Sequence, residues 1–140
     1  MKTVLANGVF DVFHYGHLAY LQEARKYGDV LVVAVTMDEY VNKGPGRPAF
    51  SLKERMAIVE ALAIVDQVIP SKSGPEAVKA VKPDVYVKGK EYENRLPEKA
   101  LVEFYGGRVV FTDTPTYSST AILNGQHLEL QSLIGRGRDS

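Results

Sequence analysis

The stretch from residue 7 to residue 17 constrains the fold more than any other part of the chain. It follows the apolar run 3–6 and precedes Leu18, Leu21 and Ala24, which recur at helical spacing. This order predicts a buried strand, a tight turn and the first turn of a helix. In an open α/β sheet such a turn binds phosphates, because the N-terminal N–H groups of the helix are unpaired and its dipole is positive there.

The polar residues of this turn point to a phosphate-binding role. His14 and His17 are three residues apart, which places both imidazoles on one face of the first helical turn. Gly16 between them leaves the backbone open to close approach by a ligand. Because Gly8, Asp11 and these three residues fall within ten positions, phosphate binding is favoured over a purely structural turn.

Composition excludes several other classes of protein. The 140 residues suffice for one domain, and 17 basic residues balance 17 acidic ones, so no overall charge attracts nucleic acid or a membrane. No apolar run approaches the roughly 20 residues that span a bilayer, and the first residues do not resemble a signal peptide. The chain has no cysteine, which fits a cytoplasmic protein. A zinc site is not predicted, because His127 is the only further histidine and no protein metal site is expected.

Further apolar runs predict four more strands. Residues 30–35 form a β-branched run typical of a strand buried on both faces, and residues 67–69, 84–87 and 108–112 form shorter ones. Helical patterns separate these strands. The chain is therefore predicted to form a Rossmann-like, doubly wound α/β fold, with a mostly parallel five-stranded sheet and helices on both faces.

Local signals mark where the helices begin and end. Ser51 and Glu54 have the spacing of a capping box, Ser73 precedes a proline-containing first turn, and Pro97 can open another helix. Gly28 follows the first helix and is predicted to adopt the left-handed conformation that ends many helices.

The paired motifs GxFD, from Gly8 to Asp11, and HxGH, from His14 to His17, resemble the signature of the cytidylyltransferase-like nucleotidyltransferase family. The resemblance covers about residues 3–124, so we predict a nucleotidyltransferase domain over residues 1–124. Residues 125–140 are predicted to form a helical tail of unknown role.

The resemblance implies catalytic roles for His14, His17, Lys43 and Arg55. Lys43 lies in a loop rich in glycine and proline, which could equally be a solvated connection. Arg55 could equally be a surface residue. The other residues expected to contact the nucleotide are Gly8, Val9, Phe10, Asp11, Gly16, Lys88, Gly89, Ser118, Ser119 and Thr120.

The activity implied is nucleotidyl transfer from a nucleoside triphosphate to a small phosphorylated substrate, with release of pyrophosphate. Mg²⁺ is expected to arrive with the nucleotide, held mainly by phosphate oxygens and water, and a homodimer is expected because relatives are commonly dimeric. Segments such as 24–29 and 87–89 resemble family members that make ADP-heptose. Residues 113–116 lack the arginine that glycerol-3-phosphate cytidylyltransferases carry there.

ATP and a sugar phosphate such as D-glycero-D-manno-heptose 1-phosphate are therefore the preferred substrates. The alternatives are a CTP-dependent enzyme acting on glycerol 3-phosphate and a non-catalytic nucleotide-binding module. An RNA-binding role suggested by the HxGH tetrad alone is disfavoured by the neutral net charge.

Overall fold

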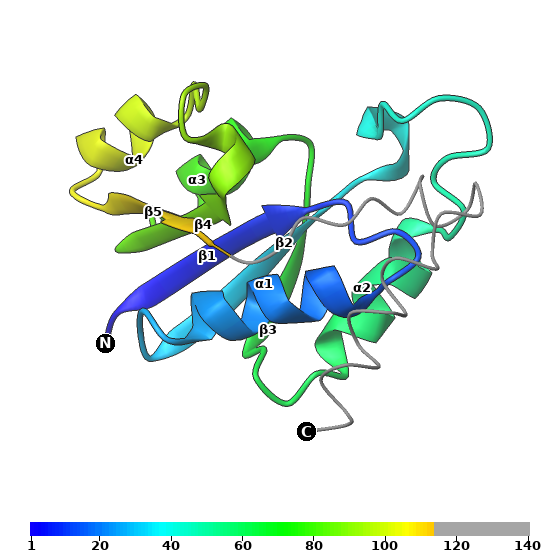
Figure 1. Cartoon of the computed structure of the whole chain (residues 1–140), viewed down its shortest axis with the longest axis horizontal. Coiled ribbons are helices and arrows are strands. Elements are labelled where there is room, and N and C mark those ends of the chain that lie inside the picture. The colour runs from blue at the N-terminus through cyan, green and yellow to red at the C-terminus, as the bar shows by residue number, and fades with distance from the viewer. Residues whose placement is uncertain (114–140) are drawn as a thin grey trace.

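The computed structural model describes residues 1–113, and its centre is a five-stranded sheet in the order β3-β2-β1-β4-β5. All neighbouring strands run parallel (Figure 1). The strands are β1 (Thr3–Gly8), β2 (Val30–Thr36), β3 (Gln67–Ser71), β4 (Val85–Gly89) and β5 (Arg108–Thr112). The prediction of a doubly wound, Rossmann-like sheet is confirmed.

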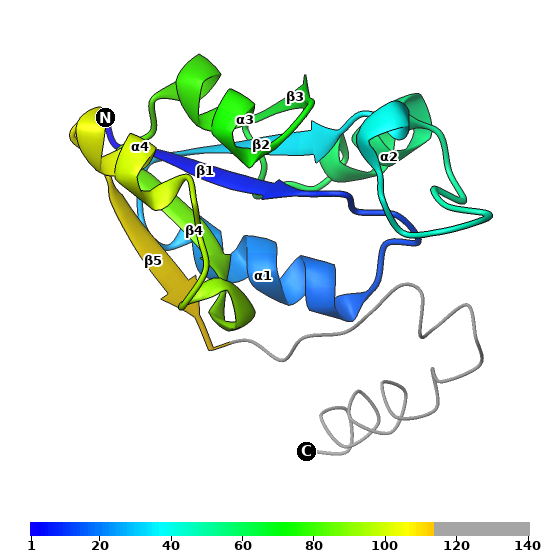
Figure 2. The ribbon, with the colours of Figure 1, turned by 90° about the horizontal axis from the view of Figure 1, so that it is seen from above.

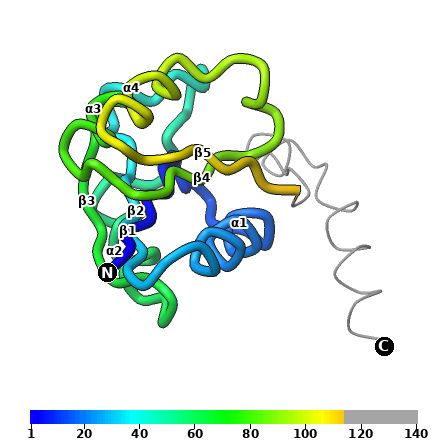
Figure 3. The backbone as a smooth tube through the Cα atoms, turned by 90° about the vertical axis from the view of Figure 1, so that its left-hand side faces the viewer, coloured from blue at the N-terminus to red at the C-terminus, as the bar shows by residue number. Residues whose placement is uncertain are grey.

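Helices cover both faces of this sheet, as the sequence predicts. They are α1 (Tyr15–Arg25), α2 (Leu52–Glu60), α3 (Gly74–Val81) and α4 (Lys99–Phe104), with short 3-10 helices η1 (Asp38–Tyr40) and η2 (Lys90–Tyr92). Figure 3 shows α1 on one side of the sheet and α3 with α4 on the other. No helix among residues 1–113 is long and apolar enough to cross a membrane.

The alternation of side chains along the strands divides the core into two layers. Val85 and Val87 pack with α1 and α2, whereas Tyr86 between them packs with α3 and α4. β1 behaves in the same way, with Val4 and Leu5 on opposite faces. Full burial of such an aliphatic side chain contributes about 1.5–3 kcal/mol to folding. Along β1 and β4, alternate side chains therefore reach opposite faces of the sheet.

The strand order changes direction at β1, because β2 and β3 lie on one side of it and β4 and β5 on the other. The neighbouring strands β1 and β4 separate at their carboxyl ends. Their pairing ends at Ala6 and Val87, although β1 continues beside β2 as far as Gly8. Beyond that point the Tyr20 hydroxyl accepts a hydrogen bond from the Asn7 N–H and donates one to the Val87 carbonyl. Open α/β sheets bind ligands in the crevice at such a reversal.

One predicted helix end is wrong. α1 ends in an ordinary right-handed conformation at Lys26, and Gly28 is not among the glycines with positive φ. Gly28 is needed because a larger residue would not fit. A Cβ there would lie 2.7 Å from Val4 Cγ2 and 2.8 Å from the Lys2 carbonyl oxygen. The left-handed C-cap occurs at Lys82, after α3. Close packing of the chain against β1 therefore explains this glycine.

Candidate active site

The two histidines cap the N-terminus of α1. His14 is the N-cap residue, and its Nδ1 accepts a hydrogen bond from the Gly16 N–H at 3.1 Å. In return, Nδ1 of His17 accepts one from the His14 N–H at 3.3 Å. The rings stack with their centroids 3.8 Å apart. The expectation that both imidazoles share one face is confirmed, and they satisfy helix donors that usually need a serine or aspartate.

This capping fixes which nitrogen of each neutral ring carries the proton. Since both Nδ1 atoms accept, a neutral imidazole carries its proton on Nε2 and offers that N–H as a donor. Burial, together with the charge of Lys43, lowers the pKa of His14 to about 4. Burial and then the neighbouring His14 and Lys43 charges lower the pKa of His17 to about 3. Both rings are therefore neutral donors at neutral pH.

The stability of the fold should depend on these two rings. Their native pKa values lie below the ordinary value of 6.5, so the unfolded chain binds about two more protons near pH 5. The stability associated with the neutral rings is therefore fully present above about pH 6.5 and is lost as the pH falls through about 4 for His14 and about 3 for His17. The pH dependence of the urea midpoint should flatten in a His14→Asn/His17→Gln variant, which retains capping side chains. Identical curves for both proteins would contradict the assignment.

The loop from residue 41 to residue 50 extends past the carboxyl ends of β1 and β2 toward the start of α1 (Figure 2). Lys43 is an exposed side chain of this loop, and its charge acts on both histidines. Partial desolvation by the surrounding loop, followed by the charge of the nearby Arg47, lowers the pKa of Lys43 itself. The structure thus brings Lys43 together with His14 and His17, as the resemblance implies.

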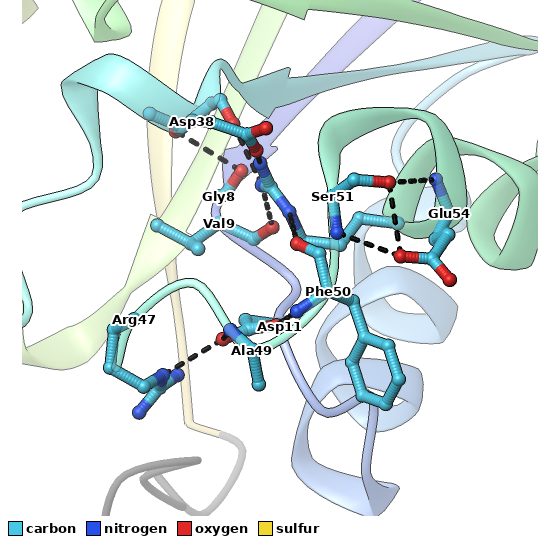
Figure 4. Close-up of polar contacts among 11 residues, drawn as sticks. Gly8, Val9, Asp11, Asp38, Arg47, Ala49, Phe50, Ser51 and Glu54 are labelled. Atoms are coloured by element: carbon cyan, nitrogen blue, oxygen red, sulfur yellow. Dashed lines mark hydrogen bonds and ion pairs between the residues drawn. The ribbon is translucent and has the colours of Figure 1, made fainter.

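Asp11 holds this loop in place. Its carboxylate accepts hydrogen bonds from Arg47 Nε at 2.8 Å, the Ala49 N–H at 2.6 Å and the Phe50 N–H at 2.9 Å (Figure 4). Burial alone would raise the pKa of Asp11, but the hydrogen bonds from Ala49, Arg47 and Phe50 bring it below its ordinary value. The side chain is only 1% exposed. Asp11 therefore positions the loop and does not present its carboxylate to a nucleotide.

Phe10 is also an interior residue. Its side chain is 3% exposed and packs edge-on against the His17 ring, with centroids 5.4 Å apart. The backbone of the turn is strained, because Phe10 and Val12 have φ values of 54° and 47°, which β-branched valine in particular disfavours. Both side chains, Phe10 and Asp11, are buried and support the site from inside, and their predicted contacts with the nucleotide stay predictions.

Replacing Asp11 by asparagine should release the loop. The carboxamide would turn an N–H₂ group toward donors that now face an oxygen, so we expect a loss of about 2 kcal/mol in the free energy of unfolding. The KM for the nucleotide should rise about tenfold, since Lys43 loses its fixed position. Urea denaturation and initial rates measure the two effects, with Glu39→Gln on the exposed η1 as the control. Unchanged stability and KM would show that Asp11 does not hold the loop.

Arg55 is fully buried, so it is not a surface residue. It forms four hydrogen bonds: Nε donates to the Phe50 carbonyl at 2.9 Å, Nη1 to the Val9 and Thr36 carbonyls at 2.8 and 2.7 Å, and Nη2 to Asp38 at 2.5 Å (Figure 4). A guanidinium has five N–H groups. Arg55 therefore joins the ends of β1 and β2 to the start of α2, and its contact with the phosphates stays a prediction.

The remaining predicted nucleotide contacts fall into three groups. Gly16 is buried in the first turn of α1, and Gly8 and Val9 offer backbone groups at the end of β1, where both carbonyls accept internal hydrogen bonds. Lys88 and Gly89 end β4. Ser118, Ser119 and Thr120 lie outside the described residues, as do the predicted domain boundary at residue 124 and the tail.

Residues 1–113 contain no group of three or more histidine, aspartate or glutamate side chains placed to hold a metal ion. The carboxylate closest to the histidines in the sequence, Asp11, already accepts three hydrogen bonds.

Together, the reversal of the sheet, the capped start of α1 and the adjacent Lys43 define an α/β protein of the nucleotidyltransferase class. The cytidylyltransferase-like family model matches residues 5–125, and the chain belongs to this family. The resemblance stated from the motifs is confirmed.

Known proteins with similar sequences are the bifunctional HldE proteins. The protein from Desulfatibacillum aliphaticivorans is 43% identical over 128 residues, and that from Pseudomonas putida strain GB-1 is 44% identical over 127. Each alignment covers 87% of this chain but only 26% or 27% of the relative. The chain therefore spans about a quarter of the length of these curated relatives.

Two solved structures extend the comparison. A lipopolysaccharide core biosynthesis protein from Thermoplasma volcanium superposes with a TM-score of 0.67 at 32% identity, covering 84% of this chain and 99% of that one. A pantoate-beta-alanine ligase from Francisella tularensis superposes with a TM-score of 0.62 at 18% identity, covering 84% and 61%. The second likeness bears on the fold alone.

Proposed function

We propose that this chain transfers an adenylyl group from ATP to a sugar 1-phosphate, such as D-glycero-D-manno-heptose 1-phosphate, and releases pyrophosphate. The observation that carries the proposal is the pair of stacked imidazoles at the start of α1, whose Nδ1 atoms both accept capping hydrogen bonds, so that each neutral ring carries its proton on Nε2. Sequence similarity to the HldE proteins and to a protein of lipopolysaccharide core biosynthesis supports a carbohydrate acceptor.

The reaction needs no covalent intermediate on the protein. An oxygen of the acceptor phosphate attacks the α-phosphorus, and the bond to the pyrophosphate oxygen breaks as the new P–O bond forms. His14 and His17 donate hydrogen bonds to the α-phosphate oxygens, where charge develops, and Lys43 binds the departing phosphates. Each hydrogen bond to a charged oxygen is worth about 1.5–3 kcal/mol, so two formed only in the transition state would supply roughly two to four decades in rate.

Mg²⁺ would enter with the triphosphate, held mainly by phosphate oxygens and water. When bound, it supplies positive charge that bridges phosphate oxygens. The protein's own contribution is to orient the triphosphate through the start of α1 and the loop that carries Lys43.

The proposal is tested by offering ATP and CTP separately, each with heptose 1-phosphate or glycerol 3-phosphate, and measuring pyrophosphate release. We expect turnover with ATP and heptose 1-phosphate. Turnover with CTP alone would overturn the base assignment and favour the cytidylyltransferase alternative. Nucleotide binding without turnover on any acceptor would favour a non-catalytic nucleotide-binding module.

We further propose that the enzyme is a cytoplasmic homodimer, following the family resemblance. Phe104 on α4 is 72% exposed and provides one candidate contact. Sedimentation equilibrium of the purified chain measures the mass, and a monomer at all concentrations would exclude the dimer.

A further inference from the structure

A second group of polar side chains lies at the carboxyl edge of the sheet, on the face opposite the histidines. Asn7 and Lys88 follow Leu5 and Tyr86 at alternate positions of β1 and β4, so they extend toward the face covered by α3 and α4. Glu98, just before α4, acts electrostatically on Lys88. We call Asn7, Tyr86, Lys88 and Glu98 the crevice cluster, because Asn7 and Lys88 flank the point where β1 and β4 separate.

Lys88 is an unusual residue to bury. Lys88 is only 8% exposed. Within residues 1–113 its ammonium group forms no hydrogen bond or ion pair. Its one defined contact is with the ring of Tyr92, whose centroid lies 4.3 Å from Nζ. Burial lowers the pKa of Lys88, although Glu98 and Glu91 oppose this shift. A buried ammonium of this kind is costly unless a further group pairs with it.

The neighbours of Lys88 are held rigidly. The Tyr86 hydroxyl donates a hydrogen bond of 2.9 Å to Oε2 of Glu98, and a Cβ at Gly74 would overlap that carboxylate, so the glycine leaves room for it. Oδ1 of Asn7 is buried and accepts no hydrogen bond from any described residue. The cluster thus combines a fixed carboxylate, an unused acceptor and an unused donor beside the crevice.

We propose that the crevice cluster binds the hydroxyl groups of the acceptor's sugar, with Lys88 donating to one hydroxyl and Asn7 accepting from another. This inference rests on the proposed sugar-phosphate acceptor. A sugar hydroxyl both donates and accepts, which matches the mixed character of the cluster. The carboxylate of Glu98 makes the same place unsuitable for a phosphate group, because two anions would repel each other.

The position of the cluster favours the acceptor over the nucleotide. The capped start of α1 and Lys43 bind the triphosphate on one face of the sheet, whereas Lys88 and Asn7 extend toward the other. In an in-line transfer the attacking oxygen approaches opposite the leaving pyrophosphate. The sequence predicts that Lys88 contacts the nucleotide, whereas this proposal gives Lys88 to the acceptor.

The test compares Lys88→Met with wild type in steady-state kinetics. Methionine keeps an apolar stem beside Tyr92 but removes the ammonium. We expect the KM for heptose 1-phosphate to rise about tenfold, equivalent to one lost hydrogen bond of about 1.4 kcal/mol, with the KM for ATP unchanged. Butyl phosphate, which has no hydroxyl, should react equally poorly with both proteins. Lys90→Met is the control, because that neighbouring side chain is 67% exposed.

Two outcomes would overturn the inference. A rise in the KM for ATP with an unchanged KM for heptose 1-phosphate would mean that the cluster reads the ribose of the nucleotide. Equal losses for heptose 1-phosphate and butyl phosphate would mean a structural role, and thermal melting followed by circular dichroism would show whether the variant unfolds. Asn7→Ala provides a second variant if Lys88→Met does not fold.

Failure of the proposed function is distinguishable from failure of this inference. If wild type releases no pyrophosphate with any acceptor, the proposed function fails. Calorimetric titration of heptose 1-phosphate in the absence of nucleotide then still tests the cluster, because wild type should bind it at least about tenfold more tightly than Lys88→Met. Equal binding by the two proteins would reject the cluster as a sugar site.

Discussion

Replacing His14 by asparagine should lower the kcat for pyrophosphate release about 100- to 1,000-fold, the usual effect of removing one donor to a transition-state oxyanion. Asparagine is among the best N-cap residues, so the start of α1 remains satisfied. What is lost is the Nε2–H group, the nitrogen on which the capping bond at Nδ1 places the proton of the neutral ring. Nucleotide affinity should change much less, because the additional negative charge on the α-phosphate oxygens develops only as the reaction proceeds.

Single-turnover rates and calorimetric nucleotide binding separate these two effects. Tyr15→Phe is a matched control in the same turn, since its side chain is 48% exposed and belongs to neither the histidine pair nor the loop. An unchanged kcat in His14→Asn would refute the role of the imidazole. A fall in nucleotide affinity equal to the fall in kcat would assign His14 to ground-state binding instead.

The fold could be predicted from the sequence because its signals are local. The run from Val30 to Val35 is apolar throughout, as a central parallel strand requires, and it forms the core of β2. Ser51 and Glu54 predict a capping box, and both reciprocal bonds are present. The histidine pair was also predictable, because their contact depends on a spacing of three residues within one turn.

The roles of Asp11 and Arg55 were not predictable, because their partners are distant in the sequence. Asp11 binds backbone groups 38 and 39 residues away, and Arg55 donates to a carbonyl 46 residues away. No periodicity reports such contacts. Arg47, the ion-pair partner of Asp11, is likewise 36 residues away, and the burial of Lys88 had no signal beyond its place in an apolar strand.

Replacing Arg55 by methionine should lower the free energy of unfolding by about 3–5 kcal/mol, the cost of breaking a buried charged network by removing one partner. Methionine fills much of the space, but the carbonyls of Val9, Thr36 and Phe50 lose their donor. Arg55→Lys should recover little of this loss, because an ammonium has three donors and no planar fork. Urea denaturation measures each variant, and Lys53→Met on the exposed side of α2 is the control.

The same variant decides between the two roles of Arg55. If Arg55 is a positioning residue that joins β1, β2 and α2, its loss should destabilise the whole chain. Activity should then fall in proportion to the folded fraction. A phosphate ligand would give the opposite pattern: stability within about 0.5 kcal/mol of wild type, as for ordinary surface changes, and a KM for ATP raised at least about tenfold. Because the guanidinium is fully buried, we expect the first pattern. The second would show that the turn opens when nucleotide binds and that Arg55 then leaves the carbonyls it holds here.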